Sequence, residues 1–413
     1  MSEHSEGALA LVSSPLSTIL RKLLRILRRP QYPVKLHPRT THPRGHVLFS
    51  YLENPLRLSD NSSRLKAHSN QWESREIARI FVDMGYQVDA VNWSDAHFVP
   101  TRRYEIFFDI STNLARLSDV LDADTLRILH RTGSDPYYTN LAEKKRVWEV
   151  NRRRNGSYVP KRAVENPQME RKSLRVAHAC SLLGNEHTLN TYPKEDRTKI
   201  QLVTVSASEL GGSLKTHNEF VPEDREFLWF FGAGAVHKGL DLVLEAFGRH
   251  PNLILHVVGD AMSEPDFTNM YHRELKGLPN IRYHGPLPPN GREFTELVQR
   301  VYCFVAPSCS EGISPAVATC LQIGLYPIIS HDTGVSLPEG FGKYLPSLSV
   351  EQVEAAILSV HRMSSAEIAA HISETQNYAL DQYSRKKFRL MMENFISKAL
   401  STHGRAVKRE DGG

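Results

Sequence analysis

The chain has 413 residues, of which 40% are hydrophobic and 23% charged, a composition typical of a globular protein. Because this length exceeds what one compact core usually holds, we expect two domains. The net charge of +5 is mild and is concentrated in a few segments. No C-x-x-C pair occurs, so neither a disulfide framework nor a zinc site is suggested, and a reducing, cytoplasmic environment fits best. The cysteines are Cys180, Cys303, Cys309 and Cys320.

Residues 1–45 are expected to form a basic leader and a proline-rich linker. Residues 17–29 read S-T-I-L-R-K-L-L-R-I-L-R-R, with apolar side chains largely on one helical face and five cations without an acid. Such a helix suits an anionic membrane surface, which would make the protein peripheral at the inner face of a membrane. A helix docked on the protein's own body and a disordered leader are the alternatives. The apolar run is too short and too charged for a membrane span or a secretory signal.

Residues 46–205 alternate between strand-like and helical patterns, which is typical of a parallel sheet. We expect a Rossmann-like domain there, with a helix over 72–85 and strands over 46–52, 87–93, 104–110, 127–130 and 178–184.

Residues 206–375 repeat the alternation and predict a second Rossmann-like domain. Its expected strands cover 227–232, 253–259, 281–283, 303–306 and 326–330, with a helix over 240–247. Helical periodicity over 376–400 predicts a helix that is free to pack back on the N-terminal domain, and the polar residues 401–413 are expected to be disordered. Two doubly wound α/β domains that face each other would share one central cleft.

The segment 231–241 reads F-G-A-G-A-V-H-K-G-L-D and lies between a predicted strand and a predicted helix. Gly232 and Gly234 let the backbone approach an anion, and Lys238 adds a positive charge. The segment is neither a Walker loop nor the dinucleotide G-x-G-x-x-G pattern. An ordinary glycine-rich turn is the alternative interpretation.

The segment 307–330 places one carboxylate, Glu311, in a small-residue turn after an apolar strand. A carboxylate at this position can hold sugar hydroxyls. The alternative is that Glu311 only caps the following helix, which is a common role for a lone acid there.

These segments together resemble the retaining glycosyltransferases of family 4, which have the GT-B fold. The matching motifs are G-x-x-x-x-x-K-G-x-D at 232–241, L-x-L-x-x-x-G-D at 253–260, I-R-Y-H-G-P-L at 281–287 and P-S-x-S-E-G at 307–312. The resemblance is firm over about 225–335. It is looser over the N-terminal half, where segments near 72, 85–89 and 184–188 look like those of sugar-chain-building enzymes.

The resemblance implies roles for individual residues. Lys238 would bind the donor diphosphate together with Gly232, Gly234 and His237, and Glu311 would face the transferred sugar. The resemblance also implies that Gly312, Ile313 and Ser314 lie near the sugar hydroxyls or the phosphate, and His284 and Gly285 near the nucleotide base.

Two positions depart from the family pattern. An arginine often follows the first glycine of the phosphate loop, and this chain has Ala233 there. One diphosphate contact is therefore either missing or supplied by His237 or by an arginine of the N-terminal domain. The family also has a second glutamate that holds the ribose hydroxyls, and this chain has Thr319, which would bind ribose without charge assistance.

The run 129–135, L-H-R-T-G-S-D, resembles the family's strand-end histidine. We therefore expect His130 to contact the donor sugar and Arg131 to contribute to phosphate binding. Without the resemblance, a lone histidine at a strand end is more often structural.

Residues 144–175 contain eleven lysines and arginines against three glutamates. An acidic acceptor or a lipid headgroup would suit this run, although a solvated, partly mobile insertion is the simpler interpretation. No nucleic-acid-binding module surrounds these residues, so we expect no nucleic-acid partner.

The Asp122-Ala123-Asp124 run has the spacing of a metal-binding D-x-D motif. Because a helical pattern is expected directly after it, we interpret it as helix capping and expect no catalytic metal and no cofactor.

The predicted function is retaining transfer of a sugar from a nucleotide-diphosphate sugar to a glycan, lipid-linked or other hydroxyl acceptor, in polysaccharide or glycoconjugate biosynthesis. A nucleotide-sugar epimerase or a phosphorylase is the rival within enzymes. Because of Ala233 and Thr319, a catalytically silent relative that binds sugar or nucleotide, or organises a biosynthetic complex, is the rival of another class.

Overall fold

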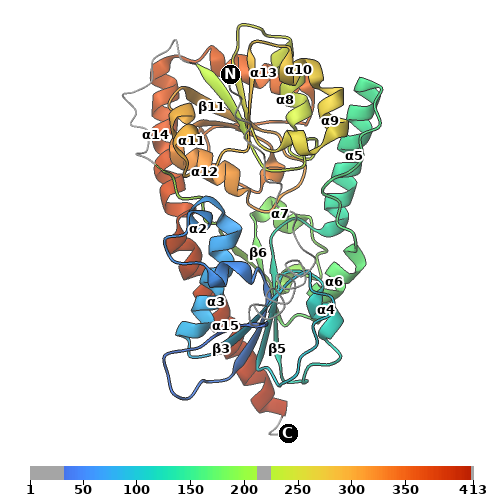
Figure 1. The fold of residues 1–413 in the computed structure, drawn as a ribbon, viewed down its shortest axis with the longest axis vertical. Helices are drawn as coiled ribbons and strands as arrows, with labels where there is room; N and C mark the ends of the chain where they lie inside the picture. The colour runs from blue at the N-terminus through green and yellow to red at the C-terminus, as the bar shows by residue number, and fades with distance from the viewer. Residues whose placement is uncertain (1–31, 212–224, 411–413) are drawn as a thin grey trace, which may run out of the picture.

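The computed structural model describes residues 32–211 and 225–410. The predicted membrane-surface segment 17–29 lies outside the described residues. The described chain forms two α/β domains, one in the lower half of Figure 1 and one in the upper half. None of the helices in the described ranges carries an apolar stretch long enough to cross a bilayer.

The N-terminal domain is built on a sheet with the strand order β1-β3-β2-β4-β5-β6-β7. The central strands are parallel, and only β1 runs antiparallel to its neighbour β3. The strands are β1 (Val34–Leu36), β2 (His46–Tyr51), β3 (Gln87–Asn92), β4 (Ile106–Asp109), β5 (Leu126–Arg131), β6 (Ala179–Leu183) and β7 (Ile200–Val203). The sequence pattern did not indicate β1 and β7, which lie at the two edges of the sheet.

Helices cover both faces of this sheet, as expected for a doubly wound domain. They are α2 (Ser63–Ala67), α3 (Ser69–Asp83), α4 (Asn113–Leu117), α5 (Pro136–Arg154), α6 (Pro167–Val176) and α7 (Glu186–Asn190), with short 3-10 turns η1 (Asn54–Arg57) and η2 (Arg197–Lys199).

The C-terminal domain has a fully parallel sheet in the order β10-β9-β8-β11-β12-β13. Its central strand β11 is buried at every residue, because helices lie on both faces. The strands are β8 (Glu226–Phe230), β9 (Leu255–Val258), β10 (Ile281–Gly285), β11 (Val301–Ala306), β12 (Tyr326–Ile329) and β13 (Lys343–Tyr344). The helices are α8 (Leu240–Gly248), α9 (Pro265–Met270), α10 (His272–Lys276), α11 (Arg292–Val298), α12 (Pro315–Ile323), α13 (Val350–His361) and α14 (Ser365–Gln382), with turns η4 (Ala261–Ser263) and η5 (His331–Thr333).

The last helix, α15 (Arg385–Glu410), returns to the N-terminal domain and crosses it diagonally (Figure 1). Its buried side chains recur at helical spacing and face α3 and β7: Phe388, Met392, Phe395, Ile396 and Ala399. The helix continues past residue 400 into the segment that we expected to be disordered.

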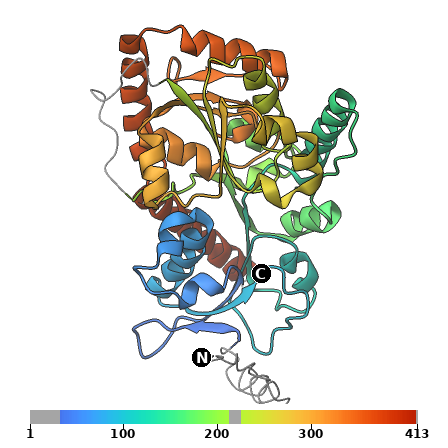
Figure 2. The same cartoon turned by 45° about the horizontal axis from the view of Figure 1, so that its top comes forward.

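Helix α5 carries much of the basic run 144–175 and reaches up along the side of the C-terminal domain, as Figures 1 and 2 show. Arg146 and Arg153 each lie 2.6 Å from the buried carboxylate of Asp241 at the start of α8. Arg154 pairs with Glu274 at 2.7 Å. The run is therefore largely ordered, and several of its cations hold the two domains together instead of facing solvent.

The Asp122-Ala123-Asp124 run does not cap a helix, because strand β5 begins at Leu126. Both carboxylates pair with Arg103 instead. The expected helix is wrong, and the expected absence of a metal remains a prediction.

Candidate active site

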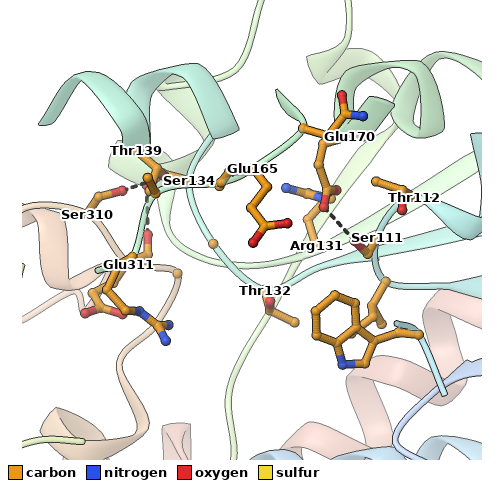
Figure 3. Close-up of a pocket in the computed structure, with 18 of the residues that line it drawn as sticks. Ser111, Thr112, Arg131, Thr132, Ser134, Thr139, Glu165, Glu170, Ser310 and Glu311 are labelled. Atoms are coloured by element: carbon orange, nitrogen blue, oxygen red, sulfur yellow. Dashed lines mark hydrogen bonds and ion pairs between the residues drawn. The ribbon is translucent and has the colours of Figure 1, made fainter. Parts of the chain in front are cut away.

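The carboxyl ends of the N-terminal strands and the loops of the C-terminal domain enclose a cavity of about 520 Å³. Its lining includes the end of β5 with residues 132–134, the loop 162–166 before α6, and the loop 310–312 after β11. Figure 3 shows Glu311 on one side of this cavity and Arg131 with Glu170 on the other. The size falls within the roughly 300–1,000 Å³ that is usual for small-molecule sites.

Lys238 and Glu311 form an ion pair across the two loops of the C-terminal domain. Their side chains are only 10% and 13% exposed. Lys238 precedes α8, whereas Glu311 belongs to the turn between β11 and α12. The alternative that Glu311 only caps the following helix does not match the geometry, because its carboxylate holds the Lys238 ammonium and Ser314 occupies the N-cap position.

Arg162 lies beside this pair. Burial lowers the pKa of Lys238 well below its usual value, and the nearby Arg162 guanidinium lowers it further. The Arg162 side chain passes over Gly234, where an added Cβ would lie 2.7 Å from Arg162 Cγ. The Arg162 guanidinium forms no salt bridge within the described residues, whereas the Arg162 amide donates to the Glu143 carboxylate at 2.7 Å. Lys238 and Arg162 therefore lie close together, with the Glu311 carboxylate paired to Lys238 and the buried Glu143 carboxylate near both cations. Two neighbouring cations can attract an anionic ligand.

Glu264, at the start of α9, organises the loop that contains Gly234. Its carboxylate accepts hydrogen bonds from the amides of Gly234 at 2.6 Å and Ala235 at 3.1 Å, and from the Tyr158 hydroxyl at 2.5 Å. These amides are therefore already satisfied by the protein. Gly232, by contrast, is exposed and has open space around it.

His237 lines the cavity but is 3% exposed. Its Nε2 lies 2.6 Å from the Ser310 carbonyl oxygen, so this nitrogen carries the proton and donates. Burial lowers the pKa of His237 to about 3, and the neighbouring Lys238 adds to the effect. His237 is thus neutral, and it fixes the loop that carries Glu311.

Gly312 lies against the backbone of the N-terminal domain in this cavity. A Cβ there would lie 2.4 Å from the Leu183 carbonyl oxygen and 2.5 Å from that of Thr132. The next two amides are taken, because Ile313 donates to Leu183 at 3.1 Å and Ser314 to Thr333 at 2.9 Å. Only Gly312 of this predicted trio therefore lines the cavity.

His130 lies in the core of the N-terminal sheet and not in the cavity. It is 0% exposed, packs on Phe108 with ring centroids 5.9 Å apart, and its Nδ1 lies 2.8 Å from Ser181 Oγ. Burial lowers its pKa to about 3. The prediction that His130 contacts the donor sugar does not fit this position, because β5 turns the next residue, Arg131, toward the cavity instead.

Thr319 also lies away from any open surface. Its hydroxyl donates to the Pro315 carbonyl at 2.8 Å and accepts from the Ser208 amide of the interdomain linker at 3.0 Å. The side chain is 0% exposed. The predicted ribose contact of Thr319 does not fit, since both partners of the hydroxyl are protein groups.

His284 and Gly285 lie at the end of β10, and the two differ in environment. His284 points into a second pocket of about 440 Å³ that includes Glu293 and Arg300, and its Nε2 lies 2.8 Å from His256 Nδ1. Gly285 adopts φ +73° with open space around it. The structure does not bring His284 into the cavity that contains Glu311.

Four residues at or beside the cavity were not assigned to the site from the sequence: Arg162, Glu264, Glu165 and Trp93. Arg162 and Glu165 belong to the charged run that we interpreted as an insertion, and no local motif marks them. Trp93 directly follows β3, and its place at the carboxyl end of a parallel strand was the one available signal.

Comparisons with known proteins agree with this architecture. Residues 225–364 match the family model of glycosyl transferases group 1. This segment contains the Lys238 and Glu311 loops. No curated protein matches the chain.

Among solved structures, sucrose-phosphate synthase from Thermosynechococcus elongatus has a TM-score of 0.59 at 11% identity, covering 86% of this chain and 99% of that one. The HepE protein of Anabaena, solved with UDP and glucose, has a TM-score of 0.53 at 10% identity, with coverages of 87% and 100%. The N-terminal domain of trehalose-6-phosphate phosphatase from Candida albicans has a TM-score of 0.53 at 10% identity, with coverages of 90% and 100%. The chain therefore has the GT-B fold of two facing Rossmann-like domains.

Proposed function

We propose that the protein transfers a sugar, with retention of configuration, from a nucleotide-diphosphate sugar to an acceptor hydroxyl in polysaccharide or glycoconjugate biosynthesis. The observation that carries this proposal is the Lys238–Glu311 pair beside Arg162. Glu311 of this pair lines the interdomain cavity, and both residues belong to the segment that matches the glycosyltransferase model.

The donor diphosphate would bind Lys238 and Arg162. Arg162 fits the place of the guanidinium that Ala233 lacks, because its side chain crosses Gly234 in the same loop. The exposed amides near Gly232 supply further donors, whereas those of Gly234 and Ala235 are held by Glu264.

Glu311 would hold hydroxyls of the transferred sugar, next to the phosphate site. Once the diphosphate takes over Lys238, the Glu311 carboxylate is released from its ion pair and is free to accept sugar hydroxyl protons. Ser134 donates to the Glu311 carbonyl oxygen at 2.8 Å and keeps this loop in place.

Negative charge develops on the leaving diphosphate, so Lys238 and Arg162 would supply electrostatic stabilisation where it matters most. The leaving phosphate would itself take the proton of the attacking hydroxyl. We propose that no metal takes part.

Binding of residues 17–29 to an anionic membrane remains a prediction. If deletion of residues 1–30 leaves the membrane-bound fraction of the protein unchanged, this prediction is wrong.

The proposal is tested by incubating the purified protein with a panel of sugar nucleotides and measuring release of the nucleoside diphosphate. Uridine nucleotides come first, because the HepE neighbour was solved with UDP and glucose. We expect one donor to be consumed, with an anomeric product of the same configuration by NMR. Release must fall sharply in Glu311→Ala, whereas an inverted product would contradict retention.

One observation favours a second function, that of a catalytically silent sugar- or nucleotide-binding relative. The buried Thr319 leaves the position expected to hold ribose without a free polar group. Binding of a nucleotide without turnover of any donor would identify this case.

A further inference from the structure

The donor groups occupy only one side of the cavity. The other side, which we call the sheet-edge half, consists of Trp93, Ser111, Thr112, Arg131, Glu165 and Glu170. Trp93 follows β3, Ser111 follows β4, and Arg131 ends β5. These side chains therefore gather at the carboxyl ends of three parallel strands, where α/β domains bind ligands.

The single cation of the sheet-edge half is already paired. Arg131 forms an ion pair with Glu170, and the two side chains are 9% and 12% exposed. Glu170 also accepts a hydrogen bond from the Ser111 hydroxyl at 2.6 Å. Because Arg131 is neutralised by a partner on the same wall, it is not available to a negatively charged acceptor.

Glu165 is different. Its carboxylate is exposed and has no hydrogen bond or ion pair within the described residues. Figure 3 shows it projecting into the middle of the cavity, between Glu311 and the Arg131–Glu170 pair. A free carboxylate at this position repels anions and accepts hydrogen bonds from hydroxyl groups.

Trp93 supplies the apolar element. Its side chain lines the cavity and the residue is 41% exposed, although large aromatic side chains usually bury most of their surface. A saturated sugar ring has an apolar C–H face that packs on an aromatic ring, and hydroxyls along its edge. One exposed indole and one free carboxylate match these two surfaces.

We propose that the sheet-edge half is the acceptor subsite and that it takes a neutral sugar, with Trp93 under the ring and Glu165 bonded to its hydroxyls. This inference rests on the proposed transfer function and names its acceptor class. Glu165 is a positioning residue here. A phosphorylated or carboxylated acceptor would place its charge beside Glu165 and Glu311 and bind more weakly.

The test measures sugar binding directly, without a donor, by ligand-observed NMR on the full chain. The neutral probes are glucose, N-acetylglucosamine and maltose, and the anionic counterparts are glucose 6-phosphate and glucuronate. The variants are Glu165→Gln and Trp93→Ala, with the exposed Glu195→Gln as the matched control. Thermal melting checks that each variant folds.

We expect at least one neutral probe to bind, at least tenfold more weakly in Glu165→Gln and Trp93→Ala, and unchanged in Glu195→Gln. With an active donor, the same variants should raise the acceptor KM and leave the donor Kd unchanged. The proposal is overturned if no neutral probe binds, if both site variants bind like the wild type, or if the anionic counterparts bind more tightly. Failure of the transfer function is separate, since it shows as absence of donor turnover in the nucleoside-diphosphate release assay.

Discussion

Arg162 is the proposed donor-site residue that lies outside the phosphate-loop motif of the sequence. We expect Arg162→Ala to weaken binding of the nucleoside diphosphate about tenfold or more, because one charge-assisted hydrogen bond contributes about 1.5–3 kcal/mol. Arg152→Ala, on the outer face of α5, is the matched control and should leave the Kd unchanged. Isothermal titration measures both.

A double variant that combines Ala233→Arg with Arg162→Ala tests this prediction further. An arginine at 233 would restore a guanidinium to the same loop, so we expect the double variant to regain part of the lost affinity. If Arg162→Ala binds the diphosphate as tightly as Arg152→Ala, Arg162 does not contact it.

The buried carboxyl group of Glu73 should make the free energy of unfolding depend on pH. Its carboxyl is 1% exposed and accepts hydrogen bonds from the Ser206 amide and hydroxyl, yet burial raises its pKa to about 7. The folded protein thus holds this proton more tightly than the unfolded chain, whose glutamate pKa is about 4.3. The resulting stabilisation is complete below the unfolded pKa and is lost as the pH rises to about 7.

We therefore expect the free energy of unfolding of the wild type to fall by about 3 kcal/mol more than that of Glu73→Gln between pH 4.5 and pH 7.5. Urea denaturation across this pH range measures the difference. Parallel pH profiles for the two proteins would contradict the raised pKa.

The grouping of single residues into one site was predictable from the sequence only where each residue lies in a motif that follows a predicted strand. Lys238 and Glu311 were assigned to one site, and the structure brings them together. His130 and Thr319 were assigned by analogy, but each finds its partners inside the core, in Ser181 and Ser208. Periodicity carries no information about such partners, because they are distant in the sequence.

Helix α5 packs on α8 through a buried ion pair between Arg146 and Asp241. Asp241 is 0% exposed and pairs with Arg146, which is 2% exposed, so removing the arginine leaves a buried carboxylate short of a partner. We expect Arg146→Ala to lower the free energy of unfolding by about 3 kcal/mol. Arg152→Ala on the same helix should change it by less than about 0.5 kcal/mol, since Arg152 is exposed.

Equilibrium denaturation in urea, followed by circular dichroism, separates the two variants. Equal destabilisation by Arg146→Ala and Arg152→Ala would mean that the contacts of α5 with α8 do not stabilise the protein.

The sequence predicted most central strands because each is an apolar run bounded by turn residues, as in β11 and β12. It did not predict α5 as an ordered element. The helix is rich in charge, and two of its buried positions are Glu143 and Arg146, which no hydrophobic pattern marks. Arg146 is buried against Asp241 of α8, which lies 95 residues later in the chain, and Glu143 accepts hydrogen bonds from the amides of Lys161 and Arg162.

The close contact at Gly312 concerns the placement of the two domains relative to each other. A methyl group there would meet the carbonyl oxygens of Leu183 and Thr132, so Gly312→Ala must push the two domains apart at the cavity. We expect it to reduce sugar transfer at least tenfold while each domain stays folded. Gly404→Ala, which has open space in α15, is the control.

Small-angle scattering and transfer assays on both variants check this prediction. Wild-type transfer by Gly312→Ala would show that the close approach at this position is not needed for activity.

The two-domain architecture was predictable from the sequence, because the strand and helix alternation starts again near residue 226. The mutual placement of the domains was not. It depends on long-range contacts such as the return of α15 and the hydrogen bond from the Ala207 amide to the Tyr383 carbonyl. The linker and the last helices are joined there, which positions both halves of the cavity.

The most direct test of the central claim is titration of the full chain with a panel of nucleoside diphosphates and sugar nucleotides, in parallel with Lys238→Ala and the exposed control Lys145→Ala. We predict that one sugar nucleotide binds the wild type and Lys145→Ala equally. Lys238→Ala should bind it about 10- to 100-fold more weakly, as loss of a charged hydrogen bond implies. Absence of binding across the panel, or equal binding by Lys238→Ala, would contradict a donor site at the Lys238–Glu311 pair.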